Sequence, residues 1–157
     1  MRERAGKYDH YNLARKIGRL GSNGRSAAPY LMRLVDEGEE EFIETLGLIG
    51  AAEAQEVLER ALTTSTTNSR IRASIALSRL GIASGDNWFF KELPTLSFKY
   101  SKDKDAWEDA LAHFWNKSTG PQRDAIRGVL SEVYGDDSAE WPSKFQPADD
   151  RARRKTD

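Results

Sequence analysis

Leu46-Gly47-Leu48-Ile49-Gly50 has a counterpart on either side of it in the 157-residue chain. The two counterparts are Ile17-Gly18-Arg19-Leu20-Gly21 and Leu77-Ser78-Arg79-Leu80-Gly81. Their closing glycines lie 29 and 31 residues from Gly50. Similarity at a period of about 30 residues indicates a repeat architecture, in which stacked units of one kind bury a shared core.

Each of these segments is expected to end a helix. The apolar residues that precede and include the middle segment keep helical spacing on one face: Phe42, Ile43, Leu46 and Ile49. The closing glycines suit the position just past a helix, where the backbone is often left-handed and a Cβ atom is unfavourable.

A second helix is expected after each glycine. The apolar stripes that define these second helices are Ala28, Leu31, Leu34 and Val35 in the first unit, Ala54, Val57, Leu58, Ala61 and Leu62 in the second, and Phe89, Phe90 and Leu93 in the third. The sequence therefore predicts an all-α fold made of antiparallel helix pairs.

A fourth pair lacks the Leu-Gly ending. Its apolar stripes are Trp107, Ala110, Leu111, Phe114 and Trp115, followed by Ala125, Ile126, Val129, Leu130 and Val133. Pro121 suits the first helical turn, and an atypical last pair suits a capping unit. We therefore expect one helical repeat domain over residues 1–135, with units at about 8–36, 39–62 and 68–93 and a capping pair at 103–134. The charged, proline-containing residues 136–157 are predicted to form a flexible tail.

Two breaks in the pattern are expected between the units. Thr63 to Ser69 is polar and is predicted to be a loop, with Asn68 as the N-cap of the next helix. Pro94 to Lys102 separates the third unit from the fourth.

The run from Asn68 to Gly81 resembles the first helix of a short HEAT-like repeat of the bilin-lyase type. The resemblance covers roughly Tyr8 to Leu93, with Arg70 as the family's arginine and Ala73 and Ala76 as its alanines. His10 and Glu39 stand in the place of that arginine in the first two units. The resemblance implies a short right-handed α-solenoid of about four helix pairs, whose concave face is lined by the second helices and binds proteins.

Composition narrows the possible chemistry. The chain has no cysteine, so disulfides and cysteine-based metal sites are excluded.

The charged start of the chain lacks the apolar stretch of a secretory signal, and no uncharged run approaches the roughly 20 residues that span a membrane. We expect a cytoplasmic protein. His10 and His113 are the only histidines and neither precedes a glutamate, so no metal, cofactor or catalytic residue is assigned.

Charge is sorted along the chain. Residues 1–35 hold 8 cations and 2 anions, whereas residues 36–60 hold 1 cation and 9 anions. Such sorting influences the choice of partner more than the fold. Glu53, Glu56 and Glu59 lie opposite the apolar stripe of their helix, with Arg60 as the only cation nearby. They predict an exposed acidic ridge, although an ordinary solvated helix face is the competing interpretation.

The resulting hypothesis is a non-catalytic protein–protein interaction module. The acidic concave face, with Tyr30 and Arg33 of the first unit assigned to the same surface, would bind a partner that presents a basic surface. An inhibitor or immunity-type protein is a sharper version of this hypothesis. One alternative is a bilin-lyase-like enzyme component. The other is nucleic-acid binding through the basic first unit, against which the sequence pI of about 6.2 argues. The cations that favour this last alternative are Arg15, Lys16, Arg19, Arg25 and Arg33.

Overall fold

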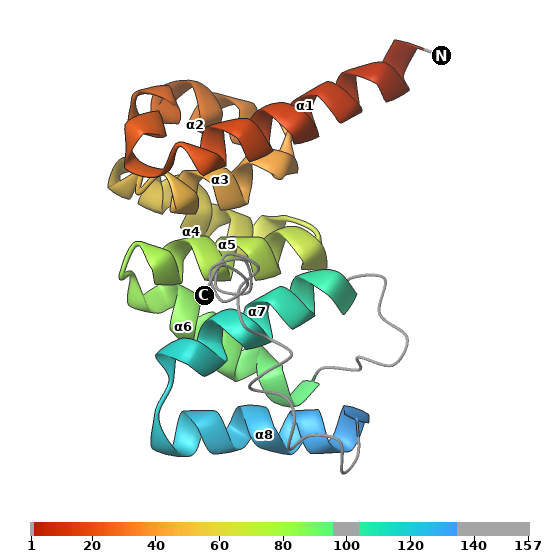
Figure 1. Cartoon of the computed structure of the whole chain (residues 1–157), viewed down its shortest axis with the longest axis vertical. Coiled ribbons are helices and arrows are strands. Elements are labelled where there is room, and N and C mark those ends of the chain that lie inside the picture. Colours follow the sequence, from red (N-terminus) through yellow and green to blue (C-terminus); the bar gives the residue numbers. More distant parts are fainter. Residues whose placement is uncertain (1, 96–103, 135–157) are drawn as a thin grey trace, which may run out of the picture. The chain divides into compact units, whose positions relative to one another are not determined.

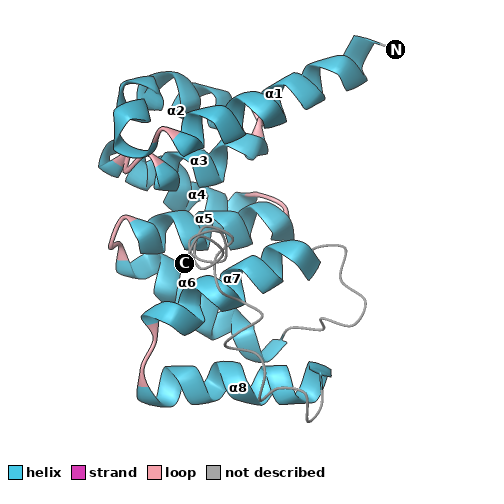
Figure 2. Cartoon of the chain, in the orientation of Figure 1, coloured by secondary structure: helices cyan, strands magenta, loops and turns pink. Residues whose placement is uncertain are grey.

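The computed structural model describes the backbone of residues 2–95 and 104–134, and the side chains of residues 9–95 and 104–132 (Figure 1). The α-helices are α1 (Arg2–Arg19), α2 (Ala28–Asp36), α3 (Ile43–Leu48), α4 (Gln55–Thr64), α5 (Thr67–Arg79), α6 (Ala83–Glu92), α7 (Lys104–Lys117) and α8 (Gly120–Tyr134). Four short 3-10 helices join them: η1 (Gly21–Ala27), η2 (Glu40–Phe42), η3 (Ala52–Ala54) and η4 (Leu93–Thr95). The described ranges contain no strand, so the predicted all-α class is confirmed (Figure 2).

The chain divides into two compact units, residues 1–89 and 90–157. In the first unit, α1 packs against α3 and α3 packs against α5, while α2 contacts α4. The helices that begin the first three predicted pairs therefore lie against one another in sequence order, and so do the helices that end the first two pairs. A shared core results, and its fully buried side chains include Leu31, Phe42, Ile43, Leu46, Ile49 and Leu58.

The predicted helix stops are confirmed. Gly21, Gly50 and Gly81 have φ angles of +53°, +69° and +75°. After α3, the amide of Ala51 donates to the Leu46 carbonyl over 3.1 Å and the Gly50 amide donates to Gly47. This pair of bonds is a Schellman motif, which satisfies carbonyl groups that the helix end would otherwise leave unpaired. Gly38, which sequence analysis did not single out, ends α2 with a φ of +96°.

The predicted loop from Thr63 to Ser69 is wrong. Helix α4 continues to Thr64 and α5 begins at Thr67, so the connection is only Ser65 and Thr66. The N-cap of α5 is Thr66 and not Asn68, because the Thr66 hydroxyl accepts a hydrogen bond from the Ser69 amide over 3.4 Å. The Asn68 side chain instead accepts from Arg72 Nε over 2.6 Å.

The second unit contains α7 and α8. Helix α7 buries most of its predicted stripe: Trp107, Ala110, Leu111 and Phe114. Trp115 is only half-buried, and the guanidinium groups of Arg123 and Arg127 lie over it, 5.1 and 5.8 Å from the centre of its ring. Pro121 lies in the first turn of α8, as predicted.

On α8, Ile126 and Leu130 are buried, four residues apart. Ala125 is exposed, contrary to prediction, since it falls beside that stripe and not on it. Val133, the predicted tail 136–157 and most of Pro94 to Lys102 lie outside the described side chains.

Candidate protein-binding surface

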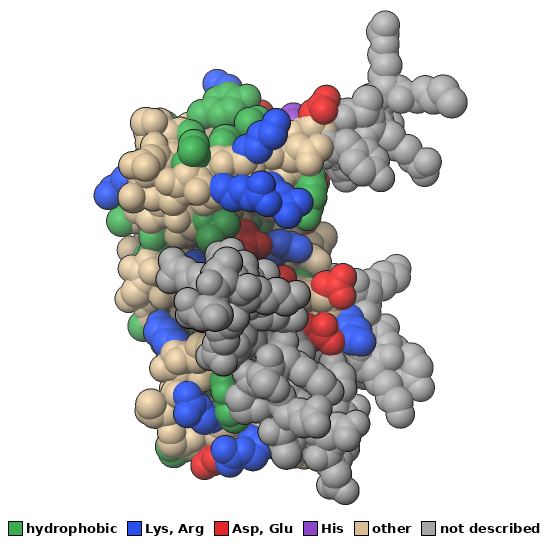
Figure 3. Space-filling view, viewed as in Figure 1, with side chains coloured by type: hydrophobic (Ala, Val, Ile, Leu, Met, Phe, Trp, Pro, Cys, Tyr) green, Lys and Arg blue, Asp and Glu red, His purple; other side chains and the backbone are tan. Residues whose placement is uncertain are grey.

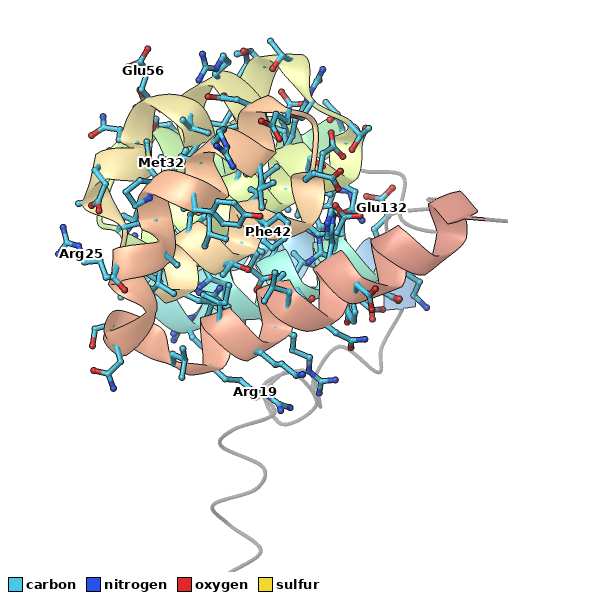
Figure 4. The ribbon with its side chains drawn as sticks, turned by 90° about the horizontal axis from the view of Figure 1, so that it is seen from above. Arg19, Arg25, Met32, Phe42, Glu56 and Glu132 are labelled. Carbon is cyan, nitrogen blue, oxygen red and sulfur yellow. The ribbon has the colours of Figure 1, made fainter. Side chains whose placement is uncertain are left out.

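The six predicted binding residues lie on neighbouring elements of the first unit. Helix α2 carries Tyr30 and Arg33, whereas η3 and α4 carry the others. Because α2 contacts α4, these residues belong to one region, which we call the α2–α4 surface: Tyr30, Arg33, Glu53, Glu56, Glu59 and Arg60. Figure 4 shows Glu56 pointing away from the body of the unit, on the opposite side from Arg19.

Glu53 does not carry an uncompensated charge. Its carboxylate accepts a hydrogen bond from Arg25 Nη2 over 3.0 Å. The pKa of Glu53 lies below its usual value, first because the carboxylate accepts a backbone hydrogen bond and then because Arg25 donates to it. The interpretation of Arg60 as the one nearby cation is therefore wrong. Arg25 reaches Glu53 from the preceding helix pair, 28 residues earlier in the chain.

Glu59 is also engaged. Its Oε1 atom accepts from Gln55 Nε2 over 3.1 Å and from the hydroxyl of Ser84 over 2.9 Å. Ser84 lies on α6, so Glu59 connects α4 with the helix after α5. Glu56 is exposed and has no hydrogen-bond or ionic partner within the described part of the chain. Of the expected row of three carboxylates, only Glu56 is free to meet a partner.

The cations of the surface have carboxylate partners too. Arg60 Nη2 lies 2.9 Å from Asp36 Oδ1 at the end of α2, and Arg33 Nε lies 3.6 Å from Glu37. The Arg33 guanidinium also lies 5.3 Å from the centre of the Tyr30 ring. Tyr30 is 50% exposed, which makes it a large aromatic side chain that is open to solvent but held by a neighbour.

Other carboxylates within residues 36–60 connect neighbouring helix pairs. Glu39 Oε2 lies 3.0 Å from His10 Nδ1, and Glu40 accepts from the hydroxyls of Thr66 and Ser69. Glu44 bridges two arginines of α5, with 2.8 Å to Arg72 and 3.1 Å to Arg79.

A signal in the sequence could have revealed several of these links. The partners in the pairs His10–Glu39, Arg25–Glu53, Glu40–Ser69 and Glu44–Arg72 are 28 or 29 residues apart, which is close to one repeat. In a stack of repeats, residues one period apart face each other across the unit boundary.

No protein-family model, curated protein or solved structure matches the chain.

Within residues 2–95 and 104–134, no helix is both long and apolar enough to cross a membrane. The same ranges contain no group of three or more His, Cys, Asp or Glu side chains arranged to hold a metal ion. His113 lies with its ring 4.9 Å from that of Phe114.

The five cations that favour nucleic-acid binding in the sequence fall into two groups. Arg25 and Arg33 are paired with carboxylates, as described above. Arg15, Lys16 and Arg19 of α1 are exposed, and no described side chain pairs with them. The open positive charge among these five cations therefore lies along α1.

Proposed function

We propose that the chain is a non-catalytic protein-binding module, built as a short α-solenoid of HEAT-like helix pairs, and that its partner binds the α2–α4 surface. The order of packing in the first unit supports this proposal, because α1, α3 and α5 follow one another while α2 lies against α4. Stacked helix pairs of this kind create extended surfaces that commonly serve for binding.

The observation that carries the proposal is the exposed Tyr30 ring beside Arg33. Tyrosine and arginine are enriched at protein interfaces, where they often dominate the binding energy. The contact with Arg33 restricts the Tyr30 side chain before any partner arrives. Little side-chain entropy is then lost on binding, which favours affinity.

The charges of the surface define the kind of partner. Arg33 and Arg60 are neutralised by acids at the end of α2, and Glu53 is neutralised by Arg25. Glu56 adds one open negative charge on the adjacent helix. The complementary partner has an apolar pocket for Tyr30 and a cation opposite Glu56. A basic toxin or enzyme held by an inhibitor or immunity-type protein is one partner of this kind.

The test compares two variants of the full chain with a matched control. The tagged chain is used to recover partners from its native host, and each recovered protein is purified and titrated against Tyr30→Ala and Glu56→Lys. We expect Tyr30→Ala to weaken binding by about 2 kcal/mol, as loss of a central interface side chain does. Glu56→Lys should chiefly slow association.

Glu132→Lys is the control, because Glu132 on α8 is likewise exposed and without a partner among the described residues. It should leave binding unchanged. All three variants should keep the stability of the wild-type protein to within about 0.5 kcal/mol, as surface changes usually do. Binding that is equally tight for both α2–α4 variants and the wild type would refute this surface as the site.

A further inference from the structure

Two side chains of α1 are exposed to solvent at positions whose equivalents in the second helix pair are buried. Leu13 and Leu20 precede Phe42 and Ile49 by 29 residues, the same spacing that separates Gly21 from Gly50. Phe42 and Ile49 are 0% exposed, whereas Leu13 is 39% and Leu20 is 55% exposed. The segment η2–α3 is covered by α1, against which it packs. Within the first unit, no described helix covers the corresponding side of α1.

The exposed surface of α1 also carries the open positive charge. Helical spacing places Lys16 between Leu13 and Leu20, three residues from one and four from the other. Arg19 lies three residues after Lys16 and next to it on the helix, whereas Arg15, four residues before Arg19, lies further round the helix from the leucines. We call these five residues the α1 outer face: Leu13, Arg15, Lys16, Arg19 and Leu20. Figure 3 shows Lys and Arg side chains next to hydrophobic ones in the upper part of the view, over α1 and its neighbours.

The lack of carboxylate partners on this face contrasts with seven other cations of the described ranges. Carboxylates pair with arginines and lysines elsewhere in the described ranges: Arg25, Arg33, Arg60, Arg72, Arg79, Lys104 and Arg127. Like charges spaced four residues apart on a helix repel each other, so Arg15 and Arg19 are stabilised by any acid placed near them. The α1 outer face thus combines two uncovered leucines with three uncompensated cations.

We propose that the α1 outer face binds an acidic amphipathic helix of a partner protein. Apolar side chains of that helix, seven residues apart, pack on Leu13 and Leu20. Carboxylates along one edge of that helix face Lys16 and Arg19, the cations nearest to the leucines, and Arg15 adds positive charge further round α1. This site is distinct from the α2–α4 surface in location and in the charge of its partner.

Two other occupants fit less well. A second copy of the chain bound through the same face would set three cations against three cations, and like charges across an interface disfavour association. Nucleic acid offers phosphates but no apolar partner for the leucines.

The test uses a designed peptide of about 18 residues, or about five helical turns, with leucines seven residues apart and flanking glutamates. A scrambled peptide of the same composition and a DNA oligonucleotide are the comparison probes. Each is labelled and titrated with the full chain by fluorescence anisotropy at two salt concentrations. We expect the helical peptide to bind and its affinity to fall with added salt, since exposed charges are screened.

Two variants and a control locate the site. The double variant Lys16→Glu with Arg19→Glu and the single variant Leu20→Gln should each weaken peptide binding by at least about tenfold. Lys91→Glu is the control, because Lys91 on α6 is also exposed and without a partner among the described residues. It should bind like the wild type. Circular dichroism melts check that each variant is folded.

Four results would overturn the proposal. These are equal binding of the scrambled peptide, no binding of the helical peptide, binding of DNA alone, or a dimer in sedimentation that Leu20→Gln dissociates. The two proposals fail separately. Tyr30→Ala should leave peptide binding unchanged, and the α1 variants should leave binding at the α2–α4 surface unchanged.

Discussion

A Cβ atom on Gly47 would lie 2.6 Å from the Cα atom of Ala76 and 2.8 Å from its Cβ atom. The backbones of α3 and α5 therefore touch at this pair, in the middle of the first unit. Gly47 lies within α3, so it is required for space and not for an unusual backbone conformation. This contact fixes how closely the second and third helix pairs approach.

Gly47→Ala should destabilise the protein by about 1 to 3 kcal/mol, because extra atoms in a tightly packed core force the backbone to move. Gly128→Ala is the matched control: no atom lies within 4 Å of a Cβ built at this position of α8. It should be neutral or stabilising by up to about 1 kcal/mol, as Gly-to-Ala changes inside helices are. Urea unfolding monitored by circular dichroism measures both. Equal effects would mean that α3 and α5 do not meet at Gly47.

Leu46→Ala should lower the free energy of unfolding by about 2 to 5 kcal/mol, the usual cost of truncating a buried leucine. Leu46 is 0% exposed and belongs to the core shared by the first helix pairs. Leu48, which is 41% exposed on the same helix, provides the comparison. Leu48→Ala should cost clearly less in the same denaturant titration, and a reversed order would contradict the register of α3.

Gly50 is required for its conformation, in contrast to Gly47. Its φ is +69° and no atom lies within 4 Å of a Cβ built there, so a side chain meets backbone strain but no clash. Gly50→Ala should cost about 1 to 2 kcal/mol, the penalty of the left-handed conformation. Gly50→Val should cost more and Gly50→Asn less, because β-branched residues tolerate a positive φ least and Asn tolerates it best. Thermal melts that rank the three variants differently would disprove the left-handed stop.

Thr66→Ala should destabilise the protein by about 1 kcal/mol through loss of the N-cap of α5. The Glu40 carboxylate accepts from the Thr66 hydroxyl over 2.9 Å, so the variant also loses a bond to the preceding helix pair. Asn68→Ala removes only the contact with Arg72 and should cost less. A larger effect at Asn68 than at Thr66 would restore Asn68 as the functional cap.

Features that depend on one helix alone could be predicted from the sequence. The buried faces around Leu46 and Leu58 follow from spacing within a single helix, and the left-handed glycines follow from the needs of a helix end. Trp115 could not be placed, because its half-exposed state depends on arginines that α8 brings over its ring. Ala125 was misplaced because a small apolar residue fits both a buried and an exposed position.

At the candidate site, too, features set by a single helix could be predicted, whereas contacts between helix pairs could not. The exposure of Glu56 could be predicted from the helix period. The engagement of Glu53 by Arg25 and of Glu59 by Ser84 depends on contacts between successive helix pairs, at separations of 28 and 25 residues. Such partners are visible in a sequence only when side chains one repeat apart are compared.

The bridge from Glu44 to Arg72 and Arg79 gives the second helix pair a preferred neighbour. The repeat register places Glu41 and Leu48 of the second helix pair at the positions that Arg72 and Arg79 occupy in the third helix pair. If the second helix pair stacked on a copy of itself, Glu44 would meet the carboxylate of Glu41 and the side chain of Leu48. Like-charge contacts of this kind are destabilising. The charges of the second helix pair thus complement those of the third helix pair and repel those of a second copy of the same pair. This asymmetry disfavours slipped stacking, in which a helix pair packs on its own equivalent and not on its successor.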